Sequence, residues 1–231
     1  MSRIDDRSSD VTDTTTARAG VQLWARGDVA GARQLLNQVS PSGDLSYFSL
    51  TIELPWHERD FDGVIAAWER PEIREIESLG GFFGYRELFL AQAYEHLGDH
   101  ESAAELLQQG VGKFSDLDRD NLRSTVAFYL INLAELLVLQ GEFERAVAIA
   151  EEAHGMTPIE ADHITGVYIA TSLSKVLARS GERDRALELL TKLIDRPAMV
   201  TRWELYLDPR WDFFRDDERF NDLIRPHNLE Q

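Results

Sequence analysis

The sequence predicts an all-α fold, a solenoid of about five helix-turn-helix hairpins. Apolar residues recur three and four positions apart from residue 14 almost to the end, and no segment alternates apolar and polar residues as a half-buried strand does. One phrase, a turn residue followed five positions later by a small residue, also recurs five times. Its small residues are Ala32, Val64, Ala103, Ala146 and Ala186. Such recurrence is typical of stacked helical hairpins.

The apolar pattern divides into five pairs of predicted helices. In chain order they are Thr14–Arg26 with Val29–Val39, Leu45–Glu58 with Phe61–Arg70, Tyr85–Leu97 with Glu101–Val111, Asn121–Gln140 with Phe143–His154, and Ala161–Ser180 with Arg183–Asp195. A glycine separates the two helices in four of the pairs, at Gly27, Gly98, Gly141 and Gly181. A helix end in the left-handed region favours glycine because it lacks a Cβ.

The small residue of each phrase has a packing role. Two antiparallel helices joined by a short loop approach closely only if their crossing point lacks bulk. Ala91 with Ala103 would supply that point in the third pair, and Ala134 with Ala146 in the fourth. We therefore expect these alanines between the helices of their pairs.

The fourth pair carries the fullest form of the phrase. Its residues are, in order, Ala134, Leu137, Gly141, Phe143, Ala146, Ala150, Ala153 and Pro158. This arrangement resembles the tetratricopeptide repeat, and shorter matches in the other pairs extend the resemblance over about residues 14–198. The second pair is the most eroded, because Arg59 replaces the turn glycine and Pro55 is expected to interrupt the first helix. The resemblance implies a right-handed superhelix.

The spacing departs from the regular repeat. Successive small residues lie 32, 39, 43 and 40 positions apart, against about 34 for a regular tetratricopeptide repeat. We expect the surplus residues in longer helices or in the segments between pairs.

Both ends of the chain are predicted to lie outside the repeats. Residues 1–13 are polar and charged, and are expected to be a disordered tail because they can bury little apolar surface. Residues 199–231 resemble the segment that closes repeat arrays in bacterial signalling proteins. That resemblance implies a cap on the last repeat, formed by Trp211, Phe214, Phe220 and Leu223. The predicted organisation is thus a tail (1–13), a repeat domain (14–198) and a capping segment (199–231).

Composition excludes several classes of function. A net charge of −17 argues against binding of nucleic acid or of an anionic membrane surface, which both require concentrated Lys and Arg. The chain has no cysteine, so a disulfide framework and cysteine-based zinc or nucleophile sites are excluded. No signal peptide or membrane-spanning segment is visible in the sequence, and a cytoplasmic location is expected.

Fragments that suggest an enzyme each lack a required part. Gly112-Lys113 is followed by Phe114, where a phosphate-binding loop needs a hydroxyl. His96 and His100 flank Gly98, where the predicted helix ends, so they do not share one helix face. We therefore predict neither an enzyme nor a cofactor. The alternative is a small-molecule- or metal-binding sensor or enzyme domain that uses four side chains near one inter-pair loop, namely His154, Glu160, Asp162 and His163.

The resemblance also implies a ligand groove, because the first helix of each tetratricopeptide pair lines a concave face. The residues expected there are Trp24, Glu53, Trp56, Tyr85, Gln92, Glu95, His96, Phe128, Glu135, Tyr168, Lys175 and Arg179. Glu53, Glu95 and Glu135 stand where some family members use cations to grip a carboxylate. We predict a groove with aromatic walls and an acidic middle, for a protein or peptide with basic and apolar groups.

The predicted function is that of a non-catalytic adaptor or regulatory scaffold. Two other interpretations stay open at this point. The groove positions could be partly buried or solvated without binding a partner, and the chain could have a purely structural role through self-association of its ends.

Overall fold

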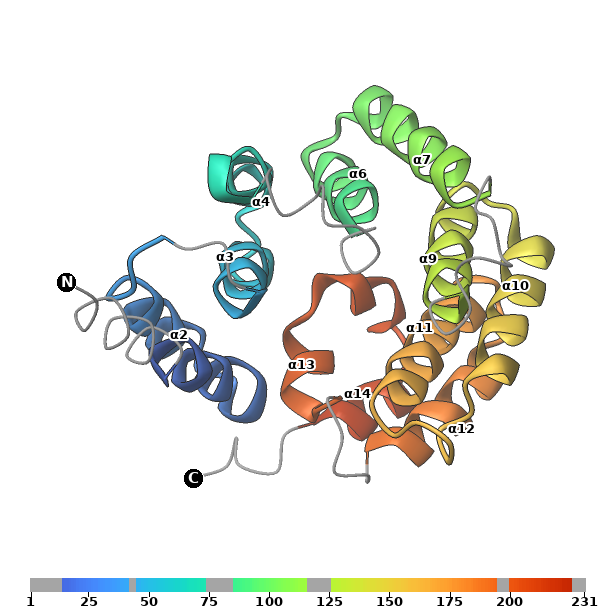
Figure 1. Cartoon of the computed structure of the whole chain (residues 1–231). Coiled ribbons are helices and arrows are strands. Elements are labelled where there is room, and N and C mark those ends of the chain that lie inside the picture. The colour runs from blue at the N-terminus through green and yellow to red at the C-terminus, as the bar shows by residue number, and fades with distance from the viewer. Residues whose placement is uncertain (1–13, 42–44, 74–84, 116–125, 195–199, 226–231) are drawn as a thin grey trace. The chain divides into compact units, whose positions relative to one another are not determined.

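The structure, a computed structural model, describes residues 14–41, 45–73, 85–115, 126–194 and 200–225. Within these ranges every regular element is a helix, and the helices pack in neighbouring pairs (Figure 1). This confirms the predicted all-α repeat fold. The predicted tail, residues 1–13, lies outside the described residues. None of the described helices has the length and apolar content needed to cross a membrane.

The described residues form two compact units. The first holds the residues before 74 together with Trp203–Pro209, and the second holds those from 85 to Arg202 together with Arg210–Arg225. The C-terminal segment is therefore divided between the units, at Pro209–Arg210.

The first unit contains the first two predicted pairs. Helical residues 14–20 continue into the π-helical turn η1 (Val21–Ala25), followed by α2 (Val29–Leu36); the next pair is α3 (Leu45–His57) and α4 (Phe61–Trp68). The small residues Ala32 and Val64 are fully buried, as close helix approach requires. One apolar cluster joins the first pair to α3 and consists of Ala19, Leu23, Ala32, Leu36, Tyr47, Leu50 and Leu54.

One turn of the first unit has the expected glycine, and the other has an arginine in its place. Gly27 has a φ of 67°, and Arg59 takes the equivalent left-handed conformation with a φ of 59° although it carries a side chain. The next residues, Asp28 and Asp60, each accept a hydrogen bond from a backbone N–H in the first turn of the following helix.

The expectation that Pro55 interrupts its helix is wrong, because α3 continues through Pro55 to His57. A proline within a helix removes one backbone hydrogen bond. In α3 this loss falls in the last turn, where the helix is about to end, and the neighbouring Leu54 and Trp56 are fully buried. Burial of these side chains keeps the last turn helical.

The second unit contains the remaining three pairs. They are α6 (Tyr85–Leu97) with α7 (His100–Ser115), α9 (Val126–Leu139) with α10 (Phe143–Met156), and α11 (Thr165–Arg179) with α12 (Arg183–Ile194). Ala103, Ala146 and Ala186 are fully buried. Part of the surplus spacing lies in α7, whose 16 residues exceed the predicted Glu101–Val111.

The start of α11 differs from the sequence prediction, which placed it at Ala161. The carboxylate of Asp162 accepts hydrogen bonds from the backbone N–H groups of Ile164 and Thr165. A carboxylate in this position satisfies the first unpaired donors of a helix. The helix therefore begins after Asp162, at Thr165.

The C-terminal segment forms α13 (Arg202–Leu207), η3 (Pro209–Phe214) and α14 (Glu218–Ile224). Trp211, Phe214 and Phe220 are buried, and their ring centroids lie 5.4 Å (Trp211–Phe220) and 4.7 Å (Phe214–Phe220) apart. Helix α14 packs against α12, and Arg219 forms an ion pair of 2.7 Å with Asp184 of α12. These contacts are of the kind expected of a cap on the last repeat, which stays a prediction.

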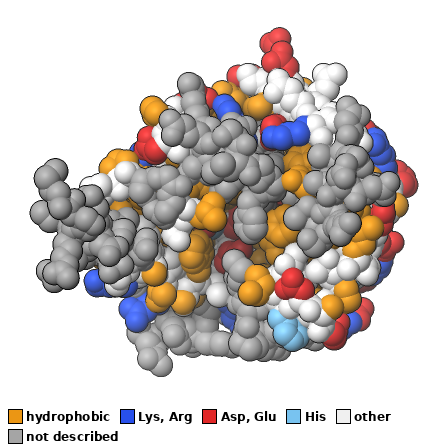
Figure 2. All heavy atoms as spheres, in the orientation of Figure 1, with side chains coloured by type: hydrophobic (Ala, Val, Ile, Leu, Met, Phe, Trp, Pro, Cys, Tyr) orange, Lys and Arg blue, Asp and Glu red, His pale blue; other side chains and the backbone are white. Residues whose placement is uncertain are grey.

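The second helices of the pairs carry mixed charges on their exposed sides. Arg185 of α12 pairs with Glu151 of α10 at 2.5 Å, and Arg145 pairs with Glu142 at 3.0 Å. Figure 2 shows acidic side chains next to basic ones along the edge of the second unit that α10 forms. Because these charged side chains are exposed to solvent, their ion pairs contribute little to stability.

Candidate interaction face

The first helices of the three pairs in the second unit are neighbours, because α9 packs against both α6 and α11. We call the surface that they share the first-helix face and define it by six predicted groove residues. These are Gln92 of α6, Phe128 and Glu135 of α9, and Tyr168, Lys175 and Arg179 of α11.

The repeat explains why these side chains gather. Gln92, Glu135 and Lys175 each precede the small residue of their repeat by eleven positions, so stacking of the repeats brings them together. Phe128 and Tyr168 lie seven residues, or about two helical turns, before Glu135 and Lys175. They form a second row on the same face. In the first unit, Glu53 likewise lies eleven positions before the small residue of its repeat, Val64.

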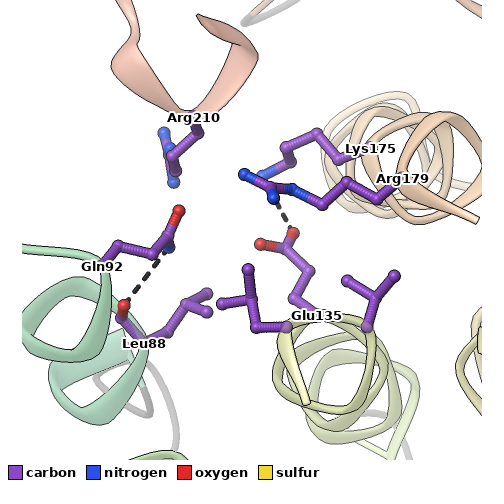
Figure 3. Close-up of a pocket in the computed structure, with 8 residues that line it drawn as sticks. Leu88, Gln92, Glu135, Lys175, Arg179 and Arg210 are labelled. Atoms are coloured by element: carbon purple, nitrogen blue, oxygen red, sulfur yellow. Dashed lines mark hydrogen bonds and ion pairs between the residues drawn. The ribbon is translucent and has the colours of Figure 1, made fainter. Parts of the chain in front are cut away.

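A buried ion pair lies at the centre of the first-helix face. The Nζ of Lys175 lies 2.9 Å from Oε1 of Glu135, and the two side chains are only 8% and 7% exposed. Figure 3 shows Lys175 and Arg179 pointing toward Glu135 from α11. The carboxylate predicted to form an acidic centre therefore has cations beside it. A charge pair this deeply buried requires both partners, because neither is well solvated.

An aromatic stack forms the second row. The rings of Phe128 and Tyr168 are nearly parallel, with centroids 4.7 Å apart and an interplanar angle of 8°. Both side chains are only partly buried. The stack joins α9 to α11 and offers an apolar surface to a ligand.

The chain's own C-terminal segment reaches the same face. Arg210 of η3 lines a small pocket with seven side chains from the first helices, namely Leu88, Gln92, Glu135, Val138, Leu139, Lys175 and Arg179. The side chains of Arg210 and Gln92 point toward one another (Figure 3). The cavity between the lining residues measures about 10 Å³, which is room for about one water molecule.

Two cation–π contacts hold this segment. The guanidinium carbon of Arg179 lies 4.0 Å from the ring centroid of Phe213, and that of Arg210 lies 5.1 Å from the ring centroid of Phe89. Sequence reasoning missed Arg210 and Phe213 as residues of this face. Their basic and aromatic character was visible, but residues 199–231 were predicted only to cap the last repeat.

The predicted groove residues of the first unit are already engaged. Trp24 donates its indole N–H to Oε2 of Glu53 at 2.7 Å. Trp56 is fully buried and donates its indole N–H to Oδ1 of Asp208 at 2.8 Å. Asp208 is itself buried, and no sequence pattern signalled this role. Trp56 is therefore a buried anchor in this structure.

Two predicted groove residues lie elsewhere, and a third is only partly described. Glu95 is exposed near the end of α6, where its Oε2 lies 3.0 Å from Nδ1 of His100. His96 is also exposed and does not line the pocket. Tyr85 begins α6, but its side chain lies outside the described residues.

The residues of the alternative site, His154, Glu160, Asp162 and His163, are not placed as a set of metal ligands. Among the described residues, no three His, Asp or Glu side chains are placed to hold a metal ion. The hydrogen bonds from Thr165, together with that from Ile164, hold the pKa of Asp162 below its ordinary value of 3.8. This carboxylate thus holds the turn that leads into α11, whose N-cap residue is Ile164.

Comparison with known proteins identifies the repeat. A family model described as "Tetratricopeptide repeat" matches residues 15–38, 87–109 and 127–152. The matched residues coincide with the first helix pair, with α6 and α7, and with α9 and α10. No curated protein matches the chain significantly.

Proposed function

We propose that this chain, which belongs to the tetratricopeptide repeat family, is a non-catalytic adaptor or regulatory scaffold that binds a protein or peptide through its first-helix face. Tetratricopeptide repeats support a role in protein interaction in general, because stacked hairpins present an extended surface to partners. The observation that carries the finer proposal is the convergence of equivalent positions, Gln92, Glu135 and Lys175, on one face of the second unit.

The chemistry of the face supports a partner with apolar groups, and the acidic net charge of the chain favours a partner that also carries basic groups. The partly exposed Phe128–Tyr168 stack provides an apolar surface of the kind that dominates binding energy in protein interfaces. The net charge of −17 favours encounter with basic segments.

The proposal is tested on partners captured by the full chain and identified by mass spectrometry. Their dissociation constants are then measured by calorimetry against purified variants. Phe128→Ala combined with Tyr168→Ala should weaken binding at least about tenfold. Removal of an aromatic anchor commonly costs about 2 kcal/mol or more of binding free energy. The matched control is Phe143→Ala, which removes an aromatic side chain that is 41% exposed at the first residue of α10.

The comparison between these variants decides the proposal. If Phe143→Ala weakens binding as much as the double variant, or if neither changes the dissociation constant, the partner does not use the first-helix face.

A further inference from the structure

The segment Arg210–Phe213 occupies the part of the first-helix face that Gln92, Glu135, Lys175 and Arg179 form. Its arginine lines the pocket beside Gln92, Glu135 and Lys175, and its phenylalanine lies under the guanidinium of Arg179. The segment thus supplies a basic and an aromatic group, which is the chemistry proposed for a partner. The remaining cavity of about 10 Å³ leaves no room for a further side chain.

The local conformation gives the segment two separate sides. In a 3-10 helix, residues three positions apart lie above one another, so Arg210 and Phe213 share one side of η3. Trp211 and Phe214 share another side and are buried, next to Phe220 of α14. The Trp211 side anchors the segment, and the Arg210 side contacts the first-helix face.

The preceding residues make a similar contact within the first unit. Asp208 accepts the hydrogen bond of Trp56, which was itself predicted to lie in the ligand groove. Gly27, at the end of the first helix of the first pair, lies so close to Trp203 that an added Cβ would overlap the indole ring. Residues 203–209 therefore lie against the first helices of that unit.

We propose that Arg210–Phe213 is an internal ligand of the first-helix face, which a partner must displace before it can bind there. This proposal rests on the proposed function of that face. Against the first-helix face, Arg210 and Phe213 make cation–π contacts of partly exposed groups, which are individually weak. The ring of Phe213 also stacks on Trp211 and Phe214 within the C-terminal segment, at centroid distances of 6.5 and 6.0 Å. Release of this side of η3 therefore does not require unfolding of the repeats.

Release is measurable without a partner because the chain contains no cysteine. Val138→Cys places a single thiol in the pocket beneath Arg210, and Ala150→Cys places one in the core of α10, away from the pocket. The rate of modification of each thiol by a disulfide reagent is measured in the full chain at increasing low concentrations of urea. The dependence of the rate on urea distinguishes local opening from global unfolding.

We expect the thiol of Val138→Cys, the pocket thiol, to react through a local opening with little dependence on urea. The thiol of Ala150→Cys, the core thiol, should react only through global unfolding. Arg210→Ala combined with Phe213→Ala should raise the rate at the pocket thiol at least about tenfold relative to the rate at the core thiol, since two weak contacts are lost. The milder Phe213→Leu should raise the same ratio less. Expressing the result as this ratio corrects for any change in global stability.

The proposal is overturned if both thiols react only through global unfolding, or if the ratio is unchanged in the double variant, because the segment is then an inseparable part of the core. With a captured partner, Arg210→Ala combined with Phe213→Ala should also tighten binding about tenfold, because the cost of displacement is removed. If the segment opens but Phe128→Ala with Tyr168→Ala leaves partner binding unchanged, the proposed function fails while the internal occupation stands.

Discussion

At the scale of single residues, the pair formed by Glu135 and Lys175 shows how the repeat organises chemistry. The two residues hold the same position in successive repeats, and both are more than nine-tenths buried. The sequence identified them as members of one face because their register is equivalent. It did not identify them as partners, because the direction of long side chains depends on their neighbours across the helix interface.

The ion pair leads to a prediction about stability. Glu135→Leu leaves Lys175 buried without its counter-charge, and should lower the free energy of unfolding by about 3–5 kcal/mol. Glu135→Leu combined with Lys175→Met should recover much of this loss, because two apolar side chains need no solvation. Urea unfolding followed by circular dichroism measures both variants. An equal loss in the single and double variants would show that the pair itself does not account for the effect.

At the scale of elements, periodicity and turn chemistry placed the helices well. The predicted Tyr85–Leu97 coincides with α6, and Phe61–Arg70 exceeds α4 by two residues. Ends are decided by individual side chains and are harder to predict, as Asp162 shows at α11. Arg59 takes the turn conformation that glycine takes elsewhere, because the hairpin fixes the backbone there.

The hydrogen bonds that Asp162 accepts at the start of α11 predict that stability depends on pH. The pKa of Asp162 is lowered from 3.8 by its hydrogen bonds to Thr165 and Ile164, so the ionised form stabilises the folded state. This contribution is complete above the unfolded pKa near 3.8 and is lost as the pH falls through the lower folded value. Asp162→Asn should therefore be less stable than the wild type near neutral pH, and the difference should shrink at more acid pH.

The experiment compares denaturant midpoints of the wild type and Asp162→Asn across this range. Asp212→Asn, at a carboxylate that forms a 2.9 Å ion pair with Arg215 outside the repeats, serves as a control for a general loss of charge. A difference between the wild type and Asp162→Asn that stays constant with pH would contradict a stabilising role for the ionised Asp162 carboxylate.

At the scale of the whole molecule, the C-terminal segment contributes residues to both units although it lies outside the repeats. Trp203–Pro209 belongs to the first unit and Arg210–Arg225 to the second. Trp211, Phe214 and Phe220 are buried against the second unit although they lie outside the repeats. The stability of the second unit should therefore depend on residues beyond its last helix pair.

This dependence is tested at Phe220, which is fully buried. Phe220→Ala should lower the free energy of unfolding by about 3–5 kcal/mol, because it removes a buried ring and leaves a cavity. Phe143→Ala removes the same side chain type from an exposed position and should change stability by less than about 1 kcal/mol. Urea unfolding of the two variants checks the contrast, and similar losses in both would argue against a stabilising role for the C-terminal segment.

The sequence by itself determined the helical class and the pairing of helices, and it predicted the six positions that define the first-helix face together with others, such as Glu95 and His96, that lie elsewhere. These follow from local periodicity, from turn residues and from the repeat, which need no knowledge of distant contacts. Only the tertiary structure decided that Glu135 pairs with Lys175, that Trp56 is held by Asp208, and that Arg210 and Phe213 lie on the predicted face. These contacts join residues that are far apart in the sequence, up to the 152 positions between Trp56 and Asp208. Such contacts depend on how the packed elements direct their side chains, which no local pattern records.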